Sequence, residues 1–377
     1  MLALRLLGVL VSGALWCVIP ASFASAGSTL SEPKVAPEGS TGAAGTELRI
    51  SAVGDIMLAG TAEPVLREVG YDYPFARVRH LFQGSHIVFG NLEGPLTDGG
   101  EPAQGKQYTF RSPPEKVVPA LLTAGFTVLS LANNHILDYG LEGLEQTLQA
   151  LEVAGIRVVG AGRNLREARR PAIIRTGGRT VAFLAYSLTL PESFYAGPDR
   201  PGTAFGHERH VRADVAAARR RADIVIVSFH WGREGETTLR EYQPELGHAA
   251  IEAGAHAVLG HHPHILQGIE RYKNGVILYS LGNFTFGSYS PMATRSAIAQ
   301  LSFRGNRLVE LRMIPINVNN VEVNFQPVPL HGSGADAVIE ELQRLSEPLG
   351  TTLGNEGGVG VVVIPGEEER RESGQTE

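Results

Sequence analysis

The chain has 377 residues, of which 19% are charged, and its formal net charge is −6 at pH 7. This charge balance excludes the basic surface that holds a protein on nucleic acid, so we expect no nucleic-acid partner. An apolar fraction of 43% and a count of 45 glycines are typical of a globular α/β protein with many loops.

The first 26 residues have the pattern of a secretory signal peptide. Arg5 is the only charge before an apolar run that reaches Ile19, and Ala24-Ser25-Ala26 is a small-x-small cleavage site. We expect cleavage after Ala26 and export to the periplasm or to the outer face of the cytoplasmic membrane. An uncleaved membrane anchor is the alternative, although the apolar run is short for a span. Cys17, the only cysteine, lies in this segment, so no disulfide is expected after cleavage.

The next residues change from a linker to a repeating strand and helix pattern. Residues 27–46 are rich in Ser, Gly, Pro and Ala and are predicted to form a disordered linker. The short apolar runs predicted as strands are 48–54, 86–91, 127–133, 157–162, 180–187, 223–230 and 255–261. Helical stretches at 114–125 and 140–155 each end at Gly, a common helix stop. This alternation predicts an α/β fold with a buried, largely parallel sheet.

Beyond residue 264 the pattern is that of antiparallel strands. "KNG" at 273–275 and "RGN" at 304–306 are hairpin turn signals. This C-terminal antiparallel β portion completes a domain that we expect over residues 47–330. A helix at 335–349 and an acidic tail beyond about residue 366, expected to be flexible, make up the C-terminal segment 331–377.

Polar side chains follow five of the predicted strands at their carboxyl ends. They are Asp55; Asn91 and Glu93; Asn133, Asn134, His135 and Asp138; His230; and His261, His262 and His264. Each of these alone is common in a turn or at a helix cap. Together they would share the edge where α/β sheets bind ligands. Their oxygen and nitrogen atoms, without sulfur, suit Mn²⁺, Fe or Zn²⁺, so we expect a divalent-metal site there.

Six motifs, in order between residues 48 and 290, carry a family resemblance: "AVGDIML", "VFGNLEGPLT", "LSLANNHILDYG", "VSFHWGREGE", "LGHHPHILQG" and "YSLGNFTF". In these residues the chain resembles the bacterial CapA-like proteins of poly-γ-glutamate capsule synthesis, a branch of the calcineurin-like metallophosphoesterase superfamily. The resemblance implies a four-layer αββα sandwich with two divalent ions at the sheet edges. The implied metal ligands are Asp55 and His264 for one ion, Glu93 as the bridge, and Asn134, His230 and His262 for the second ion. His135 matches the general acid of the superfamily.

Two positions depart from the superfamily pattern. Met57 stands where the first motif has a histidine, so one imidazole ligand is missing, and Glu93 stands where the second motif has an aspartate. One tightly bound ion with a weaker second site is therefore an alternative to two filled sites. In the family pattern small residues occupy the position of His261, so His261 is expected to flank the ligand pair His262 and His264.

The family context indicates poly-γ-glutamate, a polyanion with an amide backbone, or a small anionic substrate. Lys106, Arg111 and Arg233 are predicted to receive its carboxylates, and the alternative is that they are ordinary loop charges. The leading hypothesis is an exported metal-dependent hydrolase acting on an anionic envelope polymer or a phosphoester. The alternative is a non-catalytic accessory protein that binds poly-γ-glutamate and helps a membrane synthase complex to export or retain it.

Overall fold

The computed structural model describes residues 47–364, and each predicted apolar run in it forms a strand, except that the run 157–162 is divided into β4 and β5 (Ala161–Gly162), which belong to different sheets. The predicted strands are β1 (Leu48–Met57), β2 (Ile87–Leu92), β3 (Val128–Ser130), β4 (Arg157–Val159), β7 (Arg179–Ser187), β9 (Ile224–His230) and β10 (Ala257–His261). β1 to β4 are parallel neighbours in one sheet, and β7, β9 and β10 are parallel neighbours in another. The predicted parallel pairing is confirmed. The expected signal peptide, linker and acidic tail lie outside the described residues.

Most of the remaining strands of the two sheets add antiparallel pairs, but β12 pairs parallel with β10 and β13 pairs parallel with β1. The first sheet has the order β17-β18-β15-β14-β1-β2-β3-β4, with β13 beside β1 and β16 beside β15, and the second has the order β11-β12-β10-β9-β7-β6. The added strands are β6 (Ala172–Thr176), β11 (Ile269–Tyr272), β12 (Gly275–Leu278), β13 (Asn283–Phe286), β14 (Arg295–Arg304), β15 (Arg307–Asn317), β16 (Val328–Pro329), β17 (Gly354–Asn355) and β18 (Gly360–Val363). Both predicted hairpins are present, as β11–β12 and β14–β15.

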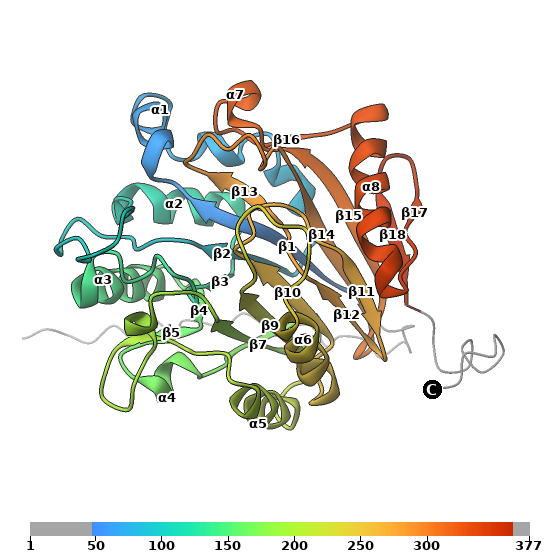
Figure 1. Cartoon of the computed structure of the whole chain (residues 1–377), viewed down its shortest axis with the longest axis horizontal. Coiled ribbons are helices and arrows are strands. Elements are labelled where there is room, and N and C mark those ends of the chain that lie inside the picture. The colour runs from blue at the N-terminus through green and yellow to red at the C-terminus, as the bar shows by residue number, and fades with distance from the viewer. Residues whose placement is uncertain (1–46, 365–377) are drawn as a thin grey trace, which may run out of the picture. The chain divides into compact units, whose positions relative to one another are not determined.

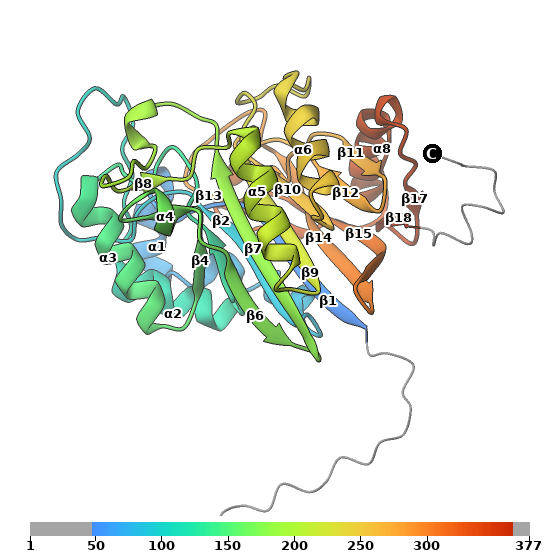
Figure 2. The ribbon, with the colours of Figure 1, turned by 90° about the horizontal axis from the view of Figure 1, so that it is seen from below.

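Helices cover the outer face of each sheet (Figures 1 and 2). The first sheet is covered by α1 (Glu63–Val69), α2 (Pro114–Ala124) and α3 (Gly140–Val153), and the second by α5 (Glu208–Arg219) and α6 (Tyr242–Glu252). Short helices α4 (Leu165–Ala168) and α7 (Asn320–Val323) lie in connections. The α2 helix ends as predicted at Gly125, which takes a left-handed φ of 95°.

The core between the sheets explains why the strands are apolar on both faces. Along β9, Ile224 and Ile226 face the other sheet, whereas Val225 and Val227 face the helices. The rings of Phe89 and Phe183, one from each sheet, stack with centroids 5.4 Å apart. A sheet buried on both faces favours continuous apolar runs. The molecule is therefore the four-layer αββα sandwich that the sequence predicted.

The C-terminal segment contributes more than the predicted helix. The expected helix is present as α8 (Ser333–Ser346), and its Val338 and Leu342 join the core between the sheets. After it, β18 pairs antiparallel with β15 and extends the first sheet, a strand that the sequence analysis did not anticipate. Within residues 47–364 no helix is both long and apolar enough to cross a membrane.

Two glycines let the strands bearing polar residues approach the chain beside them. A Cβ atom on Gly54 would lie 1.8 Å from the carbonyl oxygen of Gly282, and one on Gly260 would lie 1.9 Å from that of Tyr279. Only glycine tolerates such contacts. The backbone N–H of Asp55 donates to the Gly282 carbonyl at 3.0 Å. These close approaches bring the ends of β1 and β10 to a common edge.

Candidate metal centre

Asp55 and Asn91 form the buried part of the site, near the carboxyl ends of β1 and β2. Both side chains are fully buried. The Asn91 amide nitrogen Nδ2 donates to Asp55 Oδ1 at 2.8 Å and lies 3.3 Å from His230 Nδ1, at the end of β9. Asn133 Nδ2 donates to Asn91 Oδ1 at 3.2 Å and orients the amide. Asn91 therefore connects a carboxylate of the first sheet with an imidazole of the second, a role that its strand-end position alone did not reveal.

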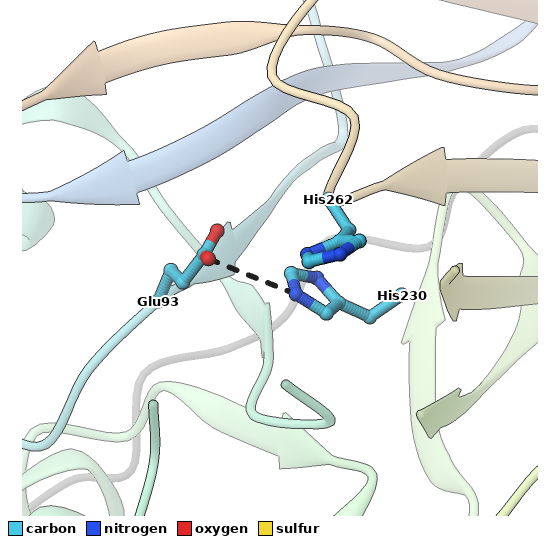
Figure 3. Close-up of side chains that lie close together, drawn as sticks. All are labelled: Glu93, His230 and His262. Carbon is cyan, nitrogen blue, oxygen red and sulfur yellow. Dashed lines mark ion pairs between the residues drawn. The ribbon is translucent and has the colours of Figure 1, made fainter. Parts of the chain in front are cut away.

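Glu93 lies between imidazoles that come from two different segments. Its Oε1 atom is 3.7 Å from His230 Nε2 and 3.8 Å from His264 Nε2. Figure 3 shows the carboxylate directed toward His230, with His262 beside it. The same Oε1 atom is buried and has no hydrogen-bond partner among the described residues. A buried carboxylate oxygen in this state lacks the compensation that proteins normally provide.

The turn after β10 presents His262 and His264. Both have left-handed backbone conformations, with φ of 94° and 60°, which non-glycine residues adopt mainly where surrounding contacts or function require it. His264 Nδ1 lies 3.1 Å from Asp55 Oδ2 and 3.0 Å from Asn283 Oδ1. The His262 ring centroid lies 4.7 Å from that of His230. The crowded histidine turn therefore faces the ends of β1 and β9.

His261 occupies a different place from its two neighbours. It is the last residue of β10 and is fully buried, with its ring 6.0 Å from the Phe89 ring. Its Nδ1 lies 3.4 Å from Asp55 Oδ1. It therefore borders the site from the core side, in keeping with the expected flanking position.

Of the two buried carboxylates, the protein itself stabilises the charge of Asp55 but not that of Glu93. Burial and then the charge of Asp55 raise the pKa of Glu93 well above its ordinary value. Burial opposes ionisation of Asp55 as well, but the neighbouring His261 and His264 outweigh it and hold the pKa of Asp55 low. Burial lowers the pKa of His262 to about 3. Burial acts in the same sense on His264, but Glu93 and Asp55 outweigh it and raise that pKa to about 9.

These residues fit a divalent cation. Two groups each place their ligand atoms within 4.8 Å of one another: Asp55, Glu93 and His264; and Glu93, His230 and His262. Asn134 Oδ1 is 2.8 Å from His230 Nε2 and so lies beside the second group. A cation would satisfy the buried Glu93 oxygen and balance the two carboxylates. The structure thus brings all six predicted ligands together, and oxygen and nitrogen donors of this kind suit Mn²⁺, Fe or Zn²⁺.

His135 lies beside this cluster in a separate network. Its Nδ1 is 2.7 Å from Asp138 Oδ2, and its backbone N–H donates to Asn133 Oδ1 at 3.1 Å. The Phe110 ring packs against it with centroids 5.0 Å apart. Burial lowers the pKa of His135, against the opposing effect of Asp138. The arrangement engages Nδ1 and holds the ring between Asp138 and Phe110.

The three predicted substrate-binding cations differ in their contacts. The Lys106 side chain is only 15% exposed, and its ammonium group binds Asp138 Oδ1 and the Asn134 carbonyl and lies 3.1 Å from His135 Nδ1. Arg111 lies over the Tyr139 ring at 4.5 Å. The Arg233 side chain is 64% exposed and pairs with Glu236 at 3.0 Å. An anion could reach Arg111 and Arg233, but at Lys106 it would have to displace Asp138.

The chain thus combines an αββα sandwich with a buried cluster of carboxylate, amide and imidazole side chains at the strand ends. Residues 49–288 match the family described as bacterial capsule synthesis protein PGA_cap, and the chain belongs to this family. This confirms the resemblance seen in the motifs.

Curated relatives agree with this assignment. The capsule biosynthesis protein CapA of Bacillus anthracis is 34% identical over 278 residues, which are 72% of this chain and 68% of the relative. The PGA biosynthesis protein CapA of Bacillus subtilis is 33% identical over 298 residues, 79% of this chain and 78% of the relative. A probable polyglutamine synthesis accessory protein of Mycobacterium tuberculosis is 35% identical over 252 residues, 62% of this chain and 66% of the relative.

Proposed function

We propose that the protein is an exported, divalent-metal-dependent hydrolase that acts on an anionic envelope polymer, with poly-γ-glutamate as the first candidate, or on a phosphoester. The observation that carries the proposal is Glu93 Oε1, buried 3.7 Å from His230 Nε2 and 3.8 Å from His264 Nε2. A metal ion bound by Glu93 would remove the free-energy cost of burying this oxygen without a hydrogen-bond donor. The names of the Bacillus relatives support a polymer of the capsule as the substrate class.

The proposed ligand sets are Asp55 and His264 for one ion, Glu93 for both, and Asn134, His230 and His262 for the second. When bound, such ions supply a water of lowered pKa and a clamp for the reacting oxygens. Asp55 and Glu93 balance the positive charge, and Asn91 holds Asp55 and His230 in place through its amide nitrogen. The rigid strand ends thus fix the geometry before substrate arrives.

His135 is the proposed proton donor to the leaving group. Asp138 binds its Nδ1 at 2.7 Å and so directs Nε2 to the substrate. Lys106 binds the other oxygen of Asp138. We therefore assign Lys106 to positioning His135, both through Asp138 and by its own contact with His135 Nδ1 at 3.1 Å, in place of the substrate contact expected from the sequence.

We propose that the anionic polymer binds at Arg111 and in the hollow beside it. The hollow has a volume of about 460 Å³. Its lining includes Arg111, Phe110 and Tyr139, and also Asp98 and the ion pair of Arg67 with Glu63. Phe110 also packs against His135, which places the hollow next to the proposed acid. A guanidinium stacked on an aromatic ring remains able to bind carboxylates. Arg233, on the exposed loop after β9, is proposed as a second contact.

A non-catalytic accessory protein is the second candidate. Met57, which replaces an imidazole of the superfamily pattern, favours it, because fewer ligands weaken at least one metal position. A relative described as an accessory protein supports it as well. Such a protein would bind poly-γ-glutamate and help a membrane synthase complex to export or retain it.

Turnover with defined metals separates the two candidates. The purified protein, stripped with EDTA and reloaded with Mn²⁺ or Zn²⁺, is incubated with poly-γ-glutamate, γ-glutamyl amides and a panel of phosphoesters. We expect metal-dependent shortening of the polymer or cleavage of a small substrate, and neither in Glu93→Gln. Polymer binding without turnover on any substrate by the metal-loaded wild type would establish the accessory role instead.

Localisation is tested on the same chain in cells. The proposed signal peptide predicts a processed protein in the envelope fraction, on the outer side of the cytoplasmic membrane. Recovery of the full-length, unprocessed chain from the cytoplasm contradicts an envelope substrate.

A further inference from the structure

Glu234 lies at the open side of the metal centre. It follows β9 in the exposed loop "WGREGE", and its carboxylate lies with nitrogens of His262 and His264 so that the three ligand atoms are within 4.8 Å of one another. None of the six ligands predicted from the motifs comes from this loop. Glu234 approaches the histidine pair from solvent, whereas Asp55 and Glu93 approach from the interior.

Backbone hydrogen bonds join the loop that carries Glu234 to the histidine turn, both before and after Glu234 in the chain. Before it, the Trp231 N–H donates to the His261 carbonyl at 3.0 Å, and after it, the Gly235 N–H donates to the Pro263 carbonyl at 2.9 Å. The buried Trp231 indole donates to the Tyr279 carbonyl at 2.8 Å. These hydrogen bonds hold the backbone of the loop beside the histidine turn.

A second observation indicates that this place binds a ligand. His262 Nδ1 is buried and, across the described part of the chain, no group forms a hydrogen bond with it. His262 and His264 hold left-handed φ values of 94° and 60° that keep both rings at this opening. Two imidazoles and a carboxylate converging in this way form a metal-ligand set.

Met57 explains why a further ligand would be needed. It stands where the superfamily pattern has an imidazole, and it packs with Phe286 and Phe110 in a small apolar cluster. The centre as a whole therefore has one ligand fewer than the pattern of the superfamily. A carboxylate at Glu234 would replace the missing donor and add negative charge.

We propose that Glu234 is a further carboxylate ligand of the divalent-metal centre, within reach of both His264 of the first ion's set and His262 of the second ion's set, and that it closes the centre toward solvent. The inference rests on the proposed metal centre and adds a ligand that the motifs do not predict. A carboxylate in place of an imidazole makes the centre more suited to a hard cation such as Mn²⁺.

Mn²⁺ titration by calorimetry tests the inference, with Glu236→Gln as the matched control. Glu236 is in the same loop, and its carboxylate is already paired with Arg233 and Arg240. In EDTA-treated protein we expect Glu234→Gln to weaken Mn²⁺ binding about tenfold or more, or to remove one binding event, because ligand-shell changes have effects of this size. Glu236→Gln should bind Mn²⁺ as the wild type does, and all three proteins should melt alike without metal.

Three outcomes separate the explanations. Wild-type affinity in Glu234→Gln overturns the inference while leaving the proposed metal centre intact. Equal weakening in both variants also overturns it, because the loop's conformation and not the Glu234 carboxylate would then be responsible. A wild-type protein that binds no Mn²⁺ or Zn²⁺ overturns the proposed metal centre itself, and this inference with it.

Discussion

At the scale of single residues, the contacts of His135 distinguish a proton donor from a metal ligand. Its Nδ1 is taken by Asp138 at 2.7 Å, and the ring packs on Phe110. His135 also belongs to neither of the metal-ligand groups that contain Glu93. Its neighbour Asn134, by contrast, turns its Oδ1 to His230 Nε2 at 2.8 Å. Two adjacent residues thus have separate proposed roles.

His135→Asn should lower turnover by about 10²–10⁴-fold on any substrate that the wild type cleaves, which is the usual contribution of general acid catalysis. Asn keeps a polar atom near Nδ1 for Asp138 and removes Nε2. Metal content and melting temperature should stay close to those of the wild type, as measured by elemental analysis and thermal unfolding. Loss of metal from this variant would make His135 a ligand.

A second prediction concerns which histidines of the crowded turn bind metal. His262→Ala should weaken Mn²⁺ binding about tenfold or more, because His262 belongs to two of the ligand groups. His261→Ala should retain the metal and lower stability instead, since the buried ring borders the core beside Phe89. Metal titration and thermal unfolding of both variants provide the comparison. Equal loss of metal in the two would show that the ligand pair is assigned to the wrong positions.

At the scale of elements, β18 shows how the C-terminal segment supports the first sheet. Val362 is 2% exposed and pairs opposite Leu311 of β15, whereas the next residue, Val363, is 63% exposed. Val362→Ala should therefore lower the free energy of unfolding by about 1–3 kcal/mol, the usual cost of removing two buried methyl groups and leaving a cavity. Val363→Ala is the matched control and should change it little. Equal effects in urea unfolding would mean that β18 is not packed as the structure shows.

His256, in the segment between β9 and β10, makes the stability of the fold depend on pH. His256 Nδ1 accepts from the Val225 N–H at 3.0 Å, and burial followed by the charge of Arg219 lowers its pKa from 6.5 to about 4. The unfolded chain therefore binds the proton first, so this contribution to stability is present above about pH 6.5 and is lost as the pH falls toward 4.

His256→Asn keeps an acceptor for Val225 and does not titrate. Between pH 7 and pH 5 the wild type should lose about 2 kcal/mol more of its free energy of unfolding than the variant does. Urea unfolding at both pH values, in EDTA so that metal release does not contribute, measures the difference. Parallel losses in the two proteins would show that His256 does not carry the effect.

At the scale of the whole molecule, the proposed metal centre joins the two sheets. Asp55 and Glu93 come from β1 and the end of β2, and His230 and His262 come from β9 and the turn after β10. The sheets otherwise meet through apolar packing, including the Phe89–Phe183 stack. An ion bound by both sheets would hold the folded state together across this interface, because the unfolded chain has no such site.

Mn²⁺ should therefore raise the melting temperature of the EDTA-treated wild type, in proportion to about 4 kcal/mol of added stability when the free metal is about 1,000 times its Kd. Glu93→Gln should show no such increase. Its metal-free form should be at least as stable as the metal-free wild type, because the substitution removes a buried carboxylate whose pKa is raised by burial and by Asp55. An unchanged response to Mn²⁺ in this variant would contradict the bridging role.

The positions of most strands and helices depend on residues within each segment, so the sequence alone indicates them. The apolar runs of β1, β2, β9 and β10 and the glycine after α2 follow from side-chain periodicity and backbone preference within each segment. Parallel strands end at one edge, so the polar residues after them could be grouped without knowing a single distance.

Tertiary structure decided what depends on contacts between distant segments. From the sequence, Lys106 is predicted to be a loop cation open to substrate, but in the fold its ammonium group binds Asp138. Asn91 is predicted only to end a strand, but in the fold β9 brings His230 beside it. Glu234 meets the histidine turn only because that turn and its own loop follow neighbouring strands. A local pattern specifies conformation, whereas the direction and partner of a polar side chain depend on which distant groups share its low-dielectric surroundings.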